Sequence, residues 1–273
     1  MKINSRCIFI VISSGVIALY LLAFALDLVY PQYMGVHSLS NLLVFRRGTG
    51  IIPAPPSFTG GWKMYMGTTY ESILLFPALL GSLKFDFTIM LASLAISASM
   101  GIAIGYSAAA IGKGYKKLII YVTKIATSAP YILVMLLVLY IARGTETGII
   151  IAISIGWFPF YVMRSLDIFD LLLRKGKIYD YKKLLFSFTP YFITDLGAIT
   201  GVVTIITYFG FYFRNPFVLD IGNIMNLGGN VSTYLFSGVW WIIIFPLFFI
   251  TVFIGFTALL SYELNGGPDN AAS

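Results

Sequence analysis

The chain contains six separate apolar stretches, each long enough to cross a lipid bilayer. The hydrocarbon core of a bilayer is about 30 Å thick, and about 20 apolar residues span it as a helix. The six stretches lie at residues 7–30, 85–110, 118–141, 148–163, 186–211 and 235–262. A composition of 59% hydrophobic and 11% charged residues is more apolar than a soluble domain of 273 residues requires. The sequence therefore predicts an all-α, polytopic membrane helix bundle of about six spans, with residues 1–273 as one domain.

The Lys and Arg residues are concentrated on one side of these spans. If the N-terminus is cytoplasmic, the inside segments hold two-thirds of them: Lys2, Arg6, Lys113, Lys116, Lys117, Lys124, Arg164, Arg174, Lys175, Lys177, Lys182 and Lys183. The positive-inside rule then predicts a multi-pass protein of the cell membrane with both termini in the cytoplasm. Because the basic residues flank spans, the formal net charge of +7 indicates anionic membrane lipid, and not nucleic acid, as a partner.

The sequence offers little for chemistry at a metal, a disulfide or a nucleotide. Cys7 is the only cysteine and His37 the only histidine, which removes an internal disulfide and a Cys/His metal cluster. The chain has no Gly-x-x-x-x-Gly-Lys-Ser/Thr stretch for nucleotide phosphates. We therefore expect no catalytic residues, no metal and no cofactor on this chain.

Two outside segments, 31–84 and 212–234, separate the spans, and neither has the composition of a domain. The first contains several prolines and a Gly-Gly pair, followed by residues 69–83, which we expect to form an amphipathic helix at the membrane interface. The second contains Asn230 in the sequon Asn-Val-Ser, a candidate glycosylation site on the outer side.

The inside segment 164–185 is predicted to begin with an amphipathic helix. Asp167, Asp170 and Arg174 recur at helical spacing, and leucines and a phenylalanine occupy the opposite side. One interpretation is a solvated connector whose charges hold the topology. The other is a docking helix for a cytoplasmic partner.

Two ionisable residues, Lys124 and Asp195, are predicted to lie one to two helical turns inside the membrane. A charge at that depth is unfavourable unless it is paired or hydrated, so each is a candidate functional residue. Lys124 could extend its ammonium group to the surface, and Asp195 could lie in a water-filled vestibule. The remaining alternative is an interhelical ion pair that forms in one transport state.

Small residues are frequent in the second predicted span, where Gly101 and Gly105 stand among alanines and serines. Such spacing lets helix backbones approach closely. Packing within the bundle is the simpler interpretation, and a subunit interface is the alternative.

Three runs of sequence resemble one family of membrane proteins. Residues 64–69 read Met-Tyr-Met-Gly-Thr-Thr, residues 128–133 read Ser-Ala-Pro-Tyr-Ile-Leu, and residues 156–164 read Gly-Trp-Phe-Pro-Phe-Tyr-Val-Met-Arg. In order and spacing they resemble the Gly-Thr-Asp segment, the proline break in the third span and the Trp-Pro-x-Tyr-x-x-x-Arg run of permease subunits from binding-protein-dependent ABC importers for dipeptides and oligopeptides. The resemblance extends from about residue 66 to residue 262.

This resemblance implies the type I ABC importer permease fold and alternating-access import of peptides or related small solutes. It also implies three kinds of protein partner: a second permease subunit, two ATP-binding subunits and an extracytoplasmic solute-binding protein. In the family, a Glu-Ala-Ala motif after the fourth span seats in the ATPase. This chain has a shorter segment with Lys177, Tyr179 and Asp180 there, so the coupling-loop candidates are Asp167, Asp170, Arg174, Lys177, Tyr179 and Asp180.

Two other classes of function stay open at this point. The altered coupling loop favours a non-coupled channel or an assembly subunit derived from the same fold. An intramembrane enzyme is disfavoured because no His-Glu-x-x-His or Gly-x-Ser-x-Gly arrangement occurs and no two acidic residues share the interior of a span.

Overall fold

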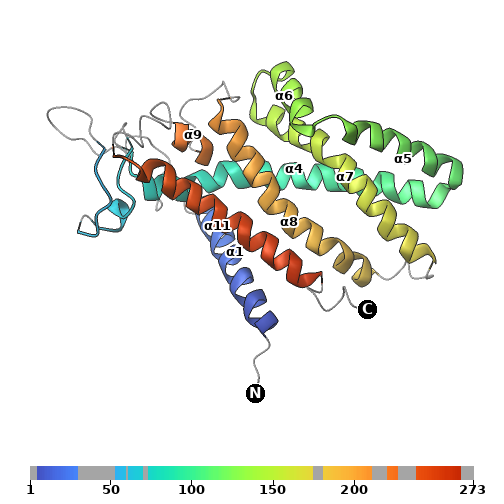
Figure 1. Cartoon of the computed structure of the whole chain (residues 1–273), viewed down its shortest axis with the longest axis horizontal. Coiled ribbons are helices and arrows are strands. Elements are labelled where there is room, and N and C mark those ends of the chain that lie inside the picture. Colours follow the sequence, from blue (N-terminus) through green and yellow to red (C-terminus); the bar gives the residue numbers. More distant parts are fainter. Residues whose placement is uncertain are drawn as a thin grey trace.

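A computed structural model describes residues 5–29, 53–59, 61–69, 73–174, 181–210, 220–226 and 238–265 (Figure 1). Its elements are α1 (Ser5–Val29), the 3-10 turn η1 (Trp62–Met64), α4 (Leu75–Ile111), α5 (Lys113–Ser128), α6 (Tyr131–Ile141), α7 (Glu146–Arg174), α8 (Tyr181–Tyr208), α9 (Ile221–Asn226) and α11 (Trp241–Leu264). Among the described residues, five helices are long and apolar enough to cross a membrane, and the bent pair α5–α6 makes a sixth if it counts as one span. The predicted all-α, multi-pass membrane bundle is thereby confirmed.

Helices α4 and α7 lie side by side and run in the same direction (Figure 1). Ser154 of α7 donates to the Ser93 carbonyl of α4 at 3.4 Å, and three turns further along α7, Ser165 donates to the Gly101 carbonyl at 3.0 Å. For α4 and α7 to cross a bilayer in the same direction, the chain between them must cross back. Helices α5 and α6 make that return.

The return is broken inside the predicted span 118–141, and the break falls within the run 128–133 that resembles the family's proline break. The axes of α5 and α6 differ by 80°. Helix α5 ends at Ser128 because Ala129 precedes a proline and adopts extended backbone angles, φ −76° and ψ 137°. Pro130 then precedes α6, where its lack of an N–H group costs no helical hydrogen bond.

Two further predicted spans proved too short. Helix α4 begins at Leu75, not at residue 85, and its 37 residues extend about 55 Å. Of the residues 69–83, which were expected to form an interfacial helix, 75–83 instead supply the first turns of α4, where Leu75 and Leu79 are buried. Helix α7 runs from Glu146 to Arg174, so the predicted span 148–163 and the amphipathic helix predicted after it form one continuous helix. The hydroxyl of Thr145 caps it by accepting the Gly148 amide at 3.0 Å.

Helices α1, α8 and α11 match the predicted spans 7–30, 186–211 and 235–262 more closely. The main differences are the start of α8, which lies five residues earlier, and the start of α11, which lies six residues later. In α8, Pro190 falls inside the helix.

Glycines allow α4 and α7 to pack almost backbone to backbone. A Cβ atom added at Gly101 would lie 2.3 Å from the Tyr161 Cβ and 2.9 Å from the Phe158 carbonyl oxygen. One added at Gly105 would lie 1.8 Å from the Ser165 hydroxyl. The small residues of the second span therefore serve packing within the bundle, as the simpler interpretation predicted.

Helices α8, α11 and α1 complete the bundle, each antiparallel to the one it packs against. A Cβ atom at Gly197 of α8 would lie 2.2 Å from the Thr257 hydroxyl of α11. At one end of the bundle, Arg6 of α1 forms an ion pair with Glu263 of α11 at 3.5 Å. The first turn of α1 and the last turn of α11 thus lie at the same end, which we call the basic end because α5 begins there with three lysines in its first five residues.

The orientation of the bundle can be tested with single cysteines. In a Cys7→Ser background, Lys117→Cys lies at the basic end and Glu146→Cys lies at the opposite end. Because the positive-inside rule places the basic end in the cytoplasm, a membrane-impermeant maleimide should label only the cysteine at position 146 in intact cells. Labelling of position 117 without permeabilisation would contradict this orientation.

Candidate functional site

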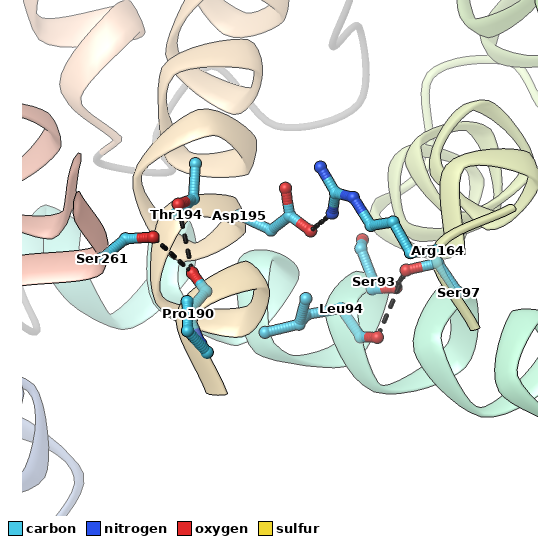
Figure 2. A network of polar contacts seen from close by, with 8 residues as sticks. All are labelled: Ser93, Leu94, Ser97, Arg164, Pro190, Thr194, Asp195 and Ser261. Atoms are coloured by element: carbon cyan, nitrogen blue, oxygen red, sulfur yellow. Dashed lines mark hydrogen bonds and ion pairs between the residues drawn. The ribbon is translucent and has the colours of Figure 1, made fainter. Parts of the chain in front are cut away.

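An ion pair between Arg164 of α7 and Asp195 of α8 joins two helices inside the bundle. The Arg164 Nη1 and the Asp195 Oδ2 are 2.5 Å apart (Figure 2). The Asp195 side chain is 3% exposed and that of Arg164 is 28% exposed. Arg164 arrives here because α7 continues past the predicted end of its span, and Asp195 because α8 packs antiparallel to α7.

Aromatic rings enclose the guanidinium group. It lies 4.8 Å from the ring centroid of Tyr191 and 5.6 Å from that of Tyr161. Tyr161 is fully buried and lies beside Phe192 of α8, at 5.9 Å between ring centroids. Because Arg stacks well on aromatic faces, the rings hold its charge where it meets Asp195.

Pro190 links this site to α11. Its ring leaves the Phe186 carbonyl without its usual helical donor. Its own carbonyl accepts two hydroxyl groups, from Thr194 at 3.1 Å within α8 and from Ser261 at 2.8 Å in α11 (Figure 2). The proline turn is therefore held against α11, one helical turn from Asp195.

The structure separates the two charged residues that were predicted inside the membrane. Asp195 is buried and forms an interhelical ion pair, but its partner is Arg164 and not Lys124. Lys124 lies on the exposed side of α5, so the alternative of an ammonium group that reaches the surface describes it better.

The coupling-loop candidates that the structure describes lie on α7 itself. Asp170 forms an ion pair with Lys116 of α5, and Asp167 and Arg174 occupy the same last turns of α7. The apolar side of this segment is packed into the bundle, because Leu166, Phe169 and Leu172 are buried. Lys177, Tyr179 and Asp180 lie outside the described residues, as does Asn230.

Two cavities flank the broken return span. One of about 340 Å³ lies at the α5–α6 break, where its lining includes Thr127, Tyr131 and Phe160. The second, of about 290 Å³, lies between α6 and α8 and is lined only by apolar side chains. The volume of the first cavity lies within the range typical of small-molecule sites, and the volume of the second lies just below that range.

A pair of acidic residues lies at the end of the bundle away from the basic end. Asp86 of α4 and Asp220, which precedes α9, are both fully buried. The Asp86 Oδ2 accepts the Ile221 amide at 3.1 Å, and the Asp220 Oδ1 caps α9 by accepting the Asn223 amide at 2.7 Å. Burial raises the pKa of Asp220 to about 6, although hydrogen bonding from the Thr207 hydroxyl and from the Asn223 and Gly222 amides lowers it.

Sequence reasoning missed this carboxyl pair. No two acidic residues share the interior of one span, and this remains true for each span taken separately. The pair forms nevertheless, because Asp220 comes from a loop and meets Asp86 of α4. A signal was present in Asp220 three residues before Asn223, the spacing of a helix cap. The sequence alone did not show that the capped turn rests on Asp86.

Among the described residues, no group of three or more His, Cys, Asp and Glu side chains is arranged to hold a metal ion. Cys7 is exposed and not in a disulfide. No model of a protein family matches the chain, and a search of curated proteins finds no match. The class defined by the structure is that of a multi-pass helical membrane protein.

Proposed function

We propose that this chain is a permease subunit of an ATP-driven ABC importer that moves peptides or related small solutes into the cell by alternating access. In this proposal the chain catalyses no reaction itself. It acts with a second permease subunit, two ATP-binding subunits and an extracytoplasmic solute-binding protein. It resides in the cell membrane with both termini in the cytoplasm and adopts the type I importer permease fold.

The observation that carries the proposal is the broken return span. Discontinuous helices in membranes occur where backbone lines a cavity, and transporters use them at substrate sites. Here the break lies at Pro130, within the run 128–133 that resembles the family's proline break, and a cavity of about 340 Å³ opens beside it.

The Arg164–Asp195 ion pair adds a second line of support. Arg164 closes the run 156–164 that resembles the family, and intramembrane charges in helical bundles commonly mark transport pathways or gates. A pair that links α7 to α8 can open in one packing of the helices and close in another, which is what alternating access requires.

One observation favours a second candidate, a non-coupled channel or assembly subunit of the same architecture. Helix α7 continues to Arg174 and α8 begins at Tyr181, so only residues 175–180 separate two helices that are packed into the bundle. A separate coupling helix between them has little chain from which to form.

Affinity purification of the tagged chain from its native membrane in mild detergent distinguishes the two. The importer predicts co-purification of a second permease and ATP-binding subunits, with ATPase activity that the solute-binding protein stimulates. Monodisperse chain that reproducibly lacks these subunits would contradict the importer and support the non-coupled candidate. The same purification of an unrelated, tagged multi-pass protein from the same membrane controls for nonspecific recovery.

A further inference from the structure

The carboxyl groups of Asp86 and Asp220 each have one oxygen without a hydrogen-bond partner. The Asp86 Oδ1 and the Asp220 Oδ2 are buried and receive no donor. None of the ion pairs in the described part of the chain involves either residue. If both carboxyl groups were ionised, two costs would arise. Each carboxylate would lose its hydration without a full replacement by hydrogen bonds, and the two negative charges would repel each other.

The two groups are held near each other by backbone contacts. Asp86 accepts the amide of Ile221, the residue that directly follows Asp220. Gly222 fixes the same turn against α8, because a Cβ atom there would lie 2.2 Å from the Thr207 hydroxyl and 2.3 Å from the Thr204 carbonyl oxygen. The carboxyls therefore cannot move apart without lifting α9 from α4 and α8.

We propose that Asp86 and Asp220 form a proton-binding site in which one shared proton joins the two carboxyl groups and holds α9 on α4. A proton on one carboxyl donates to the open oxygen of the other. This single hydrogen bond provides a partner for both oxygens and leaves one negative charge on the pair instead of two. Loss of the proton restores the repulsion and weakens the docking of α9.

Among the residues that the structure describes, the helices packed around this site contribute few ionisable side chains. Helix α4 contributes Lys84, which is partly exposed, and α8 contributes Tyr208. Helix α1 contributes Asp27, which is buried, near the contact of Phe24 with Phe87. Helix α9 and the first half of α11 contain no ionisable side chain, and Glu146 of α7 is exposed.

The direction of the pH effect follows from the Asp220 side chain. Its pKa of about 6 in the folded protein lies above the ordinary value of 3.8. Coupled carboxyl groups release their protons in two steps, and this pKa marks the first step, in which Asp220 gives up its proton and one proton remains to be shared. The stabilisation that protonated Asp220 provides is complete at pH values below the ordinary pKa and is lost as the pH rises through about 6. The docking of α9 should be firm in acid and weaker above neutral pH.

The test compares thermal unfolding of the purified full chain at about pH 5 and about pH 8. We expect the wild-type Tm to be about 5 °C lower at the higher pH. Asp86→Asn and Asp220→Asn should each remove most of this difference and unfold at a higher Tm than wild type at pH 8, because the amide donates permanently to the remaining carboxylate. Asn also retains an acceptor for the Ile221 amide and caps a helix well.

Two matched controls and one spectroscopic readout complete the test. Asp27→Asn and Glu146→Gln remove other carboxyls of the same end and should leave the Tm difference unchanged. Infrared spectra of the wild type should lose a protonated-carboxyl C=O band as the pH rises, and Asp220→Asn should lack that change. The proposal is overturned if both pair variants keep the wild-type pH dependence, if Asp27→Asn removes it, or if NaCl but not choline chloride restores the Tm at pH 8, which would indicate a cation site.

Discussion

Replacing Arg164 by leucine is expected to lower the free energy of unfolding by about 3 to 5 kcal/mol, because Asp195 is left as a buried charge without its partner. The carboxylate is almost fully enclosed between α7 and α8 and loses the guanidinium 2.5 Å away. Denaturant unfolding of the purified chain in detergent measures the change. Lys124→Leu, which removes an exposed positive charge from α5, should change stability by no more than about 0.5 kcal/mol.

A double variant separates a structural role of this pair from a role in gating. Arg164→Leu combined with Asp195→Leu removes both charges, and replacement of a buried pair by apolar residues is often neutral for stability. We expect the double variant to regain most of the lost stability. If the pair gates transport, folded double variant should be inactive in solute uptake. Full uptake activity would limit the pair to holding α7 and α8 together.

The second large effect is expected at the contact between α4 and α7. Gly101→Val should destabilise the protein by about 3 kcal/mol, because its side chain meets the backbone at Phe158 and Tyr161 with no room to shift. Gly255→Val in α11 is the matched control, since nothing lies within 4 Å of a Cβ atom added there. Equal unfolding midpoints for the two variants would contradict the close packing of α4 on α7.

The hydropathy of the sequence was sufficient to predict the class of fold and the approximate location of every crossing. It was not sufficient for the helix ends, because apolar length reports only the part of a helix that lies in lipid. Residues 75–84 contain a proline, a lysine and small residues, yet they continue α4 because Leu75 and Leu79 pack against α9 and α11. Similarly, Asp167 and Asp170 made the end of α7 look like a separate segment, although Phe169 anchors it in the bundle.

The partners of the buried charges could be predicted only in part. Asp195 was identified from its depth in a span, which is a property of one segment. Its pairing with Arg164 depends on how α7 and α8 align, and Arg164 stood at a predicted span end where a positive charge needs no partner. The Asp86–Asp220 contact joins residues 134 positions apart through a short helix of six residues. No periodicity in the sequence reports such a contact.

The parallel packing of α4 on α7 has a consequence for how the protein is made. During synthesis α4 enters the membrane before α5, α6 and α7 have been translated, so its glycine and serine surface has no partner at that time. The surface is completed only when the chain has crossed back and α7 has been inserted beside it. A nascent chain that stops after α6 therefore presents an unfinished helix contact to the membrane quality-control machinery, and degradation of such chains should fall sharply once residues up to Arg174 have left the ribosome.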